Sequence, residues 1–317
     1  MPGPYTHISI AQLLTSGRNL KKMKIPEARG ALLEYPEFCQ MGAISPDYPY
    51  LNLLDKTAKF WANAMHHKYV TSTEKNIIHV GINDIKKLVG DQKSKCLAWF
   101  LGYVSHVTAD VTCHPVTNLL VGDYEADNDV EHRESELHQD VYIFKTRLDG
   151  DVKKSEHIKN VIGKCVDPKD NKKFDPDIEQ FWSSLLSKTF PKIHAKFPLH
   201  INEWHSAVQS FLDDIAEELT VIPSRHIRES LTGRGVAYPR FDEINTTKFI
   251  AKLKTPKGTR TYDQVFNFTM KKVVEVWKLV SDGIFGDNDS FQDKIKIWDL
   301  DSGQEVKTAK VMWEGEL

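Results

Sequence analysis

The sequence lacks the features that mark several classes of protein. No stretch approaches the roughly 20 apolar residues that a membrane-spanning helix needs, and the first residues do not combine a basic segment with an apolar run, as a signal peptide does. Only four cysteines occur among the 317 residues, and none forms a CxxC pair, which argues against a disulfide framework. We therefore expect a cytoplasmic protein, with signal-peptide-independent export as the alternative.

An excess of charge of one sign is also absent. The chain has 42 Lys and Arg residues against 44 Asp and Glu residues, a formal net charge of -2. Because no general excess of positive charge is available to hold a phosphate backbone, no stable nucleic-acid partner is expected. With 40% hydrophobic residues, the composition is that of a globular protein with a sizeable core.

Helical periodicity dominates what the sequence does contain. The strongest helix is expected over residues 95–114, where the apolar repeat continues without proline until Pro115. Other helices are expected over residues 6–14, 55–67, 74–89, 129–147, 177–190, 200–219 and 262–282. The segment 42–50 contains glycine and two prolines and reads as an ordered loop, and the lysine-rich residues 149–176 read as a surface excursion.

The end of the chain has a different pattern. Apolar and polar residues alternate in two runs on either side of Asp301-Ser302-Gly303, which is typical of a β-hairpin. We therefore predict an all-α domain over residues 1–285 and a short C-terminal β-hairpin appendage over residues 286–317.

The strongest predicted helix carries an unusual polar set. His106, Asp110 and His114 follow one another at intervals of four residues, so they project from one face of the helix. Burying three such groups on an otherwise apolar helix is costly unless something satisfies them, and a metal ion would do so. For any one of them alone, a hydrogen-bonded core residue remains the simpler interpretation.

Nearby segments offer further ligands. His132 and Glu136 repeat the four-residue spacing on the following helix, so two facing helices would direct ligands inward, as in metal-binding bundles. Asp47 in the proline-bounded loop and His66 at the end of a helix would complete the coordination of the same centre. His67 points about 100° away from its neighbour on a helix, so only one of the pair is expected to be a ligand.

Five segments in order resemble the zinc-dependent phospholipase C family: THISIAQLL, GAISPD, WANAMHH, FLGYVSHVTADVTCHP and HRESE. The resemblance is closest to the phospholipase-like domain of glycosylphosphatidylinositol-specific phospholipase D and its bacterial relatives, and it covers residues 1–145. It implies an all-α helical bundle, shared by zinc-dependent phospholipases C and single-strand nucleases, that holds two or three zinc ions.

The resemblance also implies which residues bind zinc. The positions that match the ligands of the first ion are Asp47, His66, His106 and Asp110. Those that match the ligands of the second ion are His114, His132 and Glu136. Asp110 would bridge the first ion to another one. His7 and Asp110 would bind the third ion; because six residues precede His7, a backbone carbonyl such as that of Thr6 would replace the processed N-terminal residue of secreted family members.

The implied activity is phospholipase C-type hydrolysis of a phosphodiester by zinc-activated water. Asp47 is the expected catalytic residue, as a metal ligand and proton acceptor. The expected partners are a phospholipid or another phosphodiester substrate and, through peripheral contact, a membrane surface. Two alternatives remain open: a single-strand-type zinc nuclease, which shares the ligand types, and a metal-binding structural protein without turnover.

Overall fold

The structure is a computed structural model that describes residues 2–52, 55–67, 75–123, 128–153, 155–210, 237–286 and 289–315. Its described N-terminal elements are α1 (Pro4–Thr15), α2 (Gly17–Leu20), α3 (Pro26–Glu34), α4 (Pro36–Gly42), the 3-10 helix η1 (Ser45–Leu51), α5 (Ala58–Met65) and α6 (Ile77–Ile85). The central elements are α7 (Gly90–Val121), α8 (Asp129–Leu148), α9 (His157–Lys164), β1 (Val166–Asp167), β2 (Asp170–Phe174), α10 (Pro176–Thr189) and α11 (Pro191–His194).

The chain is also helical over residues 201–210, at the start of the helix predicted for 200–219, the rest of which lies outside the described residues. The C-terminal elements are η2 (Phe241–Glu243), the π-helix η3 (Thr247–Ala251), β3 (Leu253–Thr255), β4 (Gly258–Arg260), α14 (Tyr262–Phe285), α15 (Phe291–Lys294), β5 (Trp298–Asp299) and β6 (Gln304–Glu305). No described helix is both long enough and apolar enough to cross a membrane.

The predicted fold class is confirmed. Helices make up most of the described chain, and its strands form three antiparallel two-stranded sheets, β1–β2, β3–β4 and β5–β6. The last of these is the small β element expected around residues 301–303. Trp298, Leu300 and Trp313 join the same hydrophobic core as the helices, and the division of the chain at residue 285 stays a prediction.

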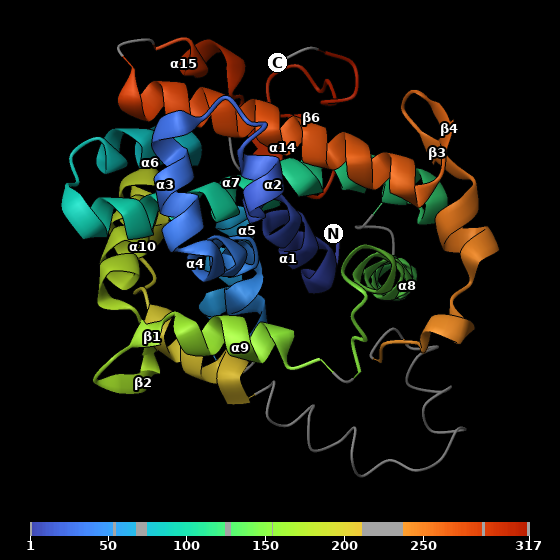
Figure 1. Ribbon diagram of the computed structural model, residues 1–317, viewed down its shortest axis with the longest axis horizontal. Helices are drawn as coiled ribbons and strands as arrows, with labels where there is room; N and C mark the ends of the chain where they lie inside the picture. The colour runs from blue at the N-terminus through green and yellow to red at the C-terminus, as the bar shows by residue number, and fades with distance from the viewer. Residues whose placement is uncertain are drawn as a thin grey trace.

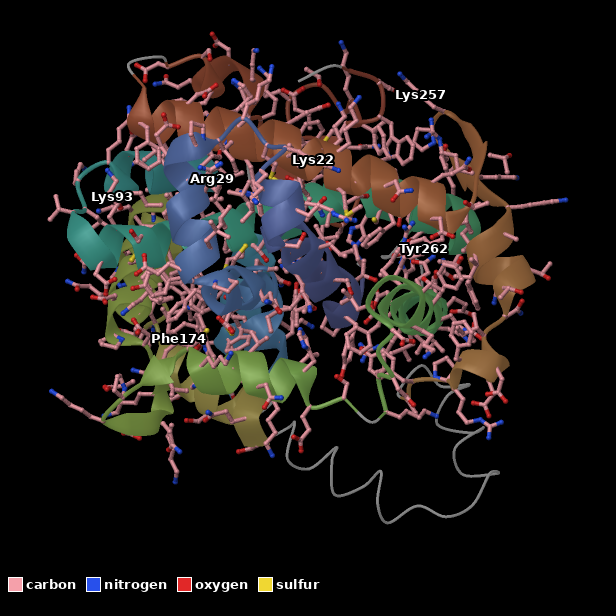
Figure 2. All side chains as sticks on the ribbon, viewed as in Figure 1. Lys22, Arg29, Lys93, Phe174, Lys257 and Tyr262 are labelled. Carbon is pink, nitrogen blue, oxygen red and sulfur yellow. The ribbon has the colours of Figure 1, made fainter. Side chains whose placement is uncertain are left out.

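The long helix α7 organises the molecule. It runs through the middle of the assembly, with α14 along one side and α1, α3 and α4 against it (Figure 1). Large apolar side chains fill the spaces between the helices, including Trp99 of α7 and Trp277 of α14, both fully buried. Charged side chains such as Lys22 and Arg29 project outward, whereas Phe174 is buried (Figure 2).

The crossing of α4 and α7 depends on two glycines. A Cβ atom on Gly42 would lie 1.9 Å from the carbonyl oxygen of Trp99, and one on Gly102 would lie 1.9 Å from that of Cys39. Only glycine allows two helix backbones to approach so closely. This contact matters for the site because it brings the end of α4 beside His106.

Pro115 does not end the helix as the sequence suggested, since α7 continues to Val121. Proline removes the N–H that would bond to the Val111 carbonyl and normally kinks or breaks a helix. Here the C-terminal residues cover that turn: Trp313 Nε1 donates to the Thr112 carbonyl at 2.8 Å, and a Cβ on Gly303 would lie 2.9 Å from the Val111 oxygen. Packing against this turn supports the helix across the proline.

Two other expectations need correction. The segment 42–50 is not an irregular loop throughout, because residues 45–51 wind into η1, a form that tolerates its prolines. The excursion at residues 149–176 contains α9 and the β1–β2 hairpin, and α9 buries Ile158, Val161 and Ile162 against the core. A lysine-rich composition concealed this amphipathic helix.

Candidate metal centre

Five of the predicted ligands meet at one place beside α7. They are His7 of α1, Asp47 of η1, His66 at the end of α5, and His106 and Asp110 of α7. Two overlapping groups, His7 with His106 and Asp110, and Asp47 with His66 and His106, have their ligand atoms within 4.8 Å of one another. Elements that are distant in sequence therefore build a single centre.

Asp110 lies at the middle of this centre. Its Oδ1 is 3.3 Å from His7 Nε2, and its Oδ2 is 3.2 Å from His106 Nε2. His66 Nε2 also faces Oδ2, at 3.7 Å. The two carboxylate oxygens thus face different histidines, which is the arrangement that a bridging ligand requires.

Asp47 closes the other side of the same group. Its Oδ1 lies 3.1 Å from His66 Nε2 and 4.0 Å from His106 Nε2. The side chains of His66, His106 and Asp110 are fully buried, whereas that of Asp47 is 20% exposed. Asp47 is therefore the member of these four that solvent reaches.

Backbone carbonyls hold two of the histidine rings. His66 Nδ1 lies 2.8 Å from the Ala62 carbonyl, and His106 Nδ1 lies 2.9 Å from the Ala43 carbonyl. A carbonyl can only accept a hydrogen bond, so Nδ1 carries the proton and donates it. In the neutral ring, the lone pair of Nε2 then points into the centre, as in metal-binding histidines.

The centre contains buried polar atoms that make no hydrogen bond within the described chain. They are both ring nitrogens of His7, His106 Nε2, Asp47 Oδ1 and both oxygens of Asp110. Leaving such atoms unsatisfied is costly, and native proteins rarely do so. Imidazole nitrogens and carboxylate oxygens are zinc ligands, so these residues fit a zinc site.

The charges of the ligands are strongly coupled. Burial opposes ionisation of Asp110, but His106 and His7 beside it hold the pKa of Asp110 well below its usual range. Burial likewise opposes the charged form of His66, yet the neighbouring Asp47 raises the pKa of His66 to about 9. Burial and the proximity of His106 lower the pKa of His7. The cavity thus favours carboxylates surrounded by positive charge, which a divalent ion provides.

The second predicted set is placed nearby but is less compact. His114 is 1% exposed on α7, and both of its ring nitrogens lack a hydrogen bond within the described chain. His132 of α8 has Nε2 2.7 Å from the Gly122 carbonyl. Burial and the Asp47 carboxylate raise the pKa of Glu136. Among the described residues these three form no group as tight as the first, so their shared ion stays a prediction.

Sequence reasoning missed the residue that holds α1 in place. Asp140 of α8 accepts hydrogen bonds from the backbone N–H groups of Tyr5 at 3.0 Å and Thr6 at 2.8 Å, and from the Tyr238 hydroxyl at 3.0 Å. No side chain of α1 caps its own N-terminus, which begins with Gly3 and Pro4. This missing cap was the available signal, and Asp140 supplies it from another helix.

The aromatic residues around the centre have distinct positions. Tyr48 is 1% exposed, and Trp61 is fully buried. The ring of Tyr50 lies 5.3 Å from that of His66, between centroids. His67 is buried with its ring toward Phe190, so of the two histidines only His66 faces the His–Asp group.

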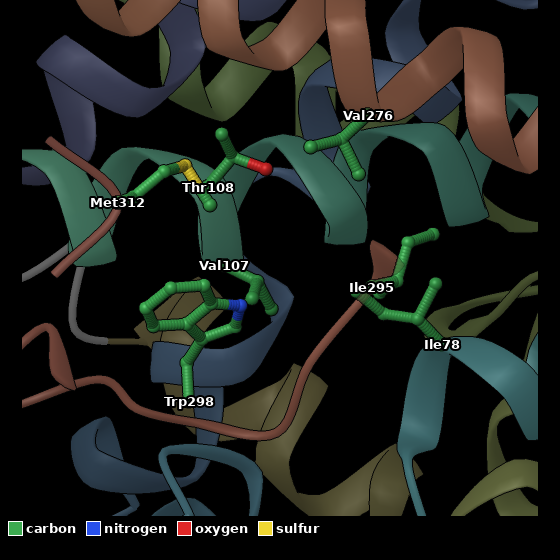
Figure 3. Close-up of a pocket in the computed structure, with 7 residues that line it drawn as sticks. All are labelled: Ile78, Val107, Thr108, Val276, Ile295, Trp298 and Met312. Carbon is green, nitrogen blue, oxygen red and sulfur yellow. The ribbon is translucent and has the colours of Figure 1, made fainter. Parts of the chain in front are cut away.

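A small apolar pocket lies elsewhere along α7. Val107, Thr108, Val276, Ile295, Trp298, Met312 and Ile78 line it (Figure 3). Its volume of about 10 Å³ admits no more than a single water molecule. It is a packing gap between α7 and the C-terminal residues and cannot hold a phospholipid head group.

The helical fold holds a buried His–Asp cluster made of the residue types that bind zinc. The family model for zinc dependent phospholipase C matches residues 6–192, which include all eight predicted ligands. The chain belongs to the zinc-dependent phospholipase C family, which confirms the resemblance drawn from its five segments. No curated protein and no solved structure gives a significant match to the chain.

Proposed function

We propose that the protein is a zinc-dependent phosphodiester hydrolase that cleaves a phospholipid at the bond between glycerol and phosphate. The observation that carries the proposal is the Asp110 carboxylate, whose two oxygens face His7 on one side and His66 and His106 on the other. Such a carboxylate suits a site with more than one metal ion, the type of centre that serves phosphodiester hydrolysis.

The residues that would hold zinc are those of the compact group, His7, Asp47, His66, His106 and Asp110, with His114, His132 and Glu136 for a further ion. When bound, zinc lowers the pKa of water, polarises the phosphoryl group and stabilises the departing oxygen. The buried helices exclude other solvent from the centre, because four members of the compact group are at most 1% exposed.

Asp47 has the position to handle the proton. Burial opposes its ionisation, but His106 and His66 lower the pKa of Asp47, so it is a carboxylate at neutral pH. It is also the partly exposed member of the compact group, with Oδ1 directed at the histidines. It can therefore bind a metal ion and orient the proton of an attacking water, and a neutral amide could not replace its charge.

The first experiment measures metal and turnover together. The protein is purified without chelator, zinc per chain is determined by elemental mass spectrometry, and hydrolysis is assayed on phosphatidylcholine vesicles. We expect two or three zinc ions and the release of diacylglycerol, with zinc content reduced and hydrolysis at least 100-fold slower in Asp110→Asn. A matched control is Asp282→Asn, which removes an exposed carboxylate of α14 paired with Lys278.

The products separate this proposal from its alternatives. Release of phosphatidic acid instead of diacylglycerol would indicate cleavage on the other side of the phosphate. Hydrolysis of a single-stranded oligonucleotide with no action on vesicles would replace the phospholipase with a nuclease. Zinc at full occupancy without turnover on any phosphodiester would favour the structural metalloprotein.

Contact with a membrane surface belongs to the same proposal. Phe60 of α5, the helix that ends at His66, is 50% exposed and stacks on Phe197 with ring centroids 4.4 Å apart. Lys56 and Lys59 lie exposed beside it. Exposed aromatic rings flanked by lysines suit the interface of an anionic lipid bilayer, so the vesicle assay includes phosphatidylserine and is read for sedimentation as well as turnover.

A further inference from the structure

The C-terminal hairpin reaches the metal centre from outside the residues that the family model matches. The turn between β5 and β6 lies on α7 beside His114, and three contacts fix it there. Leu300 N–H donates to the His66 carbonyl at 3.0 Å, and Asn118 Nδ2 donates to the Asp301 carbonyl at 3.2 Å. A Cβ on Gly303 would lie 2.6 Å from the ring of Pro115. Only glycine fits at that last contact.

The turn is also held internally. Asp299 accepts hydrogen bonds from Ser302, at 2.9 Å from its backbone nitrogen and at 3.1 Å from its hydroxyl. Gly303 N–H donates to the Asp299 carbonyl at 2.8 Å, and its φ of 69° is the left-handed conformation that glycine adopts readily. Asp301, between these anchored residues, is therefore presented in a fixed position.

Residue 301 lies between two elements that carry histidines of the centre. Asn118, which donates to the Asp301 carbonyl, follows His114 by one turn on the same face of α7, and Leu300 donates to the His66 carbonyl at the end of α5. The half-buried Asp301 is therefore placed beside the space between the end of α5 and the face of α7 that carries His114.

That space contains an unsatisfied ligand. His114 is 1% exposed, and neither of its ring nitrogens has a hydrogen-bond partner in the described chain. Burying an imidazole without hydrogen bonds is costly unless a bound group from outside the polypeptide, such as a metal ion, satisfies it. The imidazoles of His114 and His132 would be neutral ligands of a divalent ion, and Glu136 would supply one negative charge. One positive charge of the ion would then be uncompensated.

We propose that Asp301 is a carboxylate ligand of the second metal ion, together with His114, His132 and Glu136. Two imidazoles and two carboxylates give a four-coordinate, charge-neutral zinc site. This inference rests on the proposed function for the presence of zinc, and it adds a ligand from residues beyond 192, where the family match ends. The C-terminal hairpin is then part of the metal centre, and not only a support for α7.

The test compares Asp301→Asn with Asp293→Asn. Asn has nearly the same shape as Asp but no charge, and Asp293 is an exposed carboxylate of α15 on the same C-terminal segment. Zinc per chain is measured after dialysis at a series of buffered free zinc concentrations. We expect Asp301→Asn to lose one equivalent of zinc, or to bind that equivalent at least 10-fold more weakly, while Asp293→Asn behaves as wild type. Unchanged occupancy and affinity in Asp301→Asn would overturn the proposal.

Cobalt distinguishes a ligand from a merely structural residue. Co²⁺ replaces zinc, and its visible absorption depends on the number and type of ligands. We expect Asp301→Asn to alter the band of the weaker site while the thermal midpoint of the metal-free protein stays within 2 °C or so of wild type. A lower midpoint with an unchanged cobalt spectrum would assign Asp301 a structural role only. These readouts involve no substrate, so a wild-type protein that binds zinc without hydrolysis would refute the proposed function and leave the Asp301 result intact.

Discussion

The position of His7 in the centre depends on a residue of another helix. Asp140 accepts the first free N–H groups of α1, from Tyr5 and Thr6, just before His7. Buried helix N-termini need such acceptors, and a carboxylate also interacts favourably with the positive end of the helix dipole. The third predicted zinc ion, which uses His7, therefore depends indirectly on Asp140.

Replacing Asp140 with alanine tests this dependence. Asp140→Ala should lower the free energy of unfolding by about 2 kcal/mol, because it leaves two buried backbone N–H groups and the Tyr238 hydroxyl without their acceptor. It should also weaken the zinc ion bound by His7. Urea unfolding and zinc content measure both effects, with Asp149→Asn, an exposed change on the end of α8, as the control. Full zinc occupancy in Asp140→Ala would show that His7 holds its place without this cap.

A second residue, His205, makes the fold sensitive to acid. Its side chain is fully buried, with Nδ1 3.5 Å from the Tyr48 hydroxyl, and burial lowers the pKa of His205 from its ordinary 6.5 to about 4. As the pH falls, His205 therefore becomes protonated near pH 6.5 in the unfolded chain but only near pH 4 in the folded protein. Folding stability contributed by this residue is lost as the pH falls through that range.

Replacing this imidazole by a ring that cannot be charged removes the effect. Between pH 7.5 and pH 5, the free energy of unfolding should fall in both proteins, but the fall should be about 2 kcal/mol smaller in His205→Phe than in wild type. The ring would still pack against Tyr48 and Phe174, which surround His205. Urea titrations at the two pH values measure the difference, and parallel losses in both proteins would contradict it.

At the level of elements, the crossing of α4 and α7 links packing to the site. Ala43, the residue that follows α4, lies where Gly102 meets that helix. Its carbonyl oxygen accepts the hydrogen bond that orients His106. A methyl group on Gly102 would strike the backbone of Cys39, which cannot move aside as a flexible side chain can. Stability and ligand orientation are therefore coupled at this crossing.

Gly102→Ala should accordingly destabilise the protein by about 3 kcal/mol or more and weaken zinc binding through His106. Gly30→Ala on the exposed face of α3 is the matched control, since an added Cβ there meets nothing within 4 Å. That change should raise stability by about 0.5 to 1 kcal/mol, as expected for alanine in a helix. Equal effects at the two glycines in thermal unfolding would exclude the close crossing.

Local pattern accounts for the parts of the fold and site that could be predicted. The four-residue spacing of His106, Asp110 and His114 is a property of one helix, so the sequence alone placed them on one face. The cap that Asp140 provides to α1 and the support of the Pro115 turn by Trp313 join residues distant in sequence. No local pattern marks such contacts, and for that reason the prediction ended α7 too early.

For the whole molecule, zinc and folding are linked. The compact group draws ligands from α1, η1, the end of α5 and α7, so the site exists only when these elements are packed together. An ion that binds the folded chain but not the unfolded one stabilises it, by about 4 kcal/mol at a thousandfold excess over its dissociation constant. Metal should therefore change the thermal midpoint as well as activity.

Removal of zinc tests this linkage directly. Dialysis against a chelator should lower the thermal midpoint of wild type by several degrees, and added zinc should restore it. Asp110→Asn should respond less in both directions. Scanning calorimetry at fixed protein concentration provides the measurement, and a midpoint that is the same with and without chelator in wild type would mean that the cluster holds no ion in the folded protein.

The hydrogen bonds from Leu300 to His66 and from Trp313 to Thr112 have a consequence for the order of biosynthesis. A ribosome releases α1, α5 and α7 well before it releases the residues that hold the His66 carbonyl and cover the proline turn of α7. Helices emerging first can pack, but these two carbonyls acquire their partners only after residues 300 and 313 have been made. Completion of the centre therefore follows the synthesis of these residues, and we expect nascent chains stalled before residue 300 to have an incomplete metal centre.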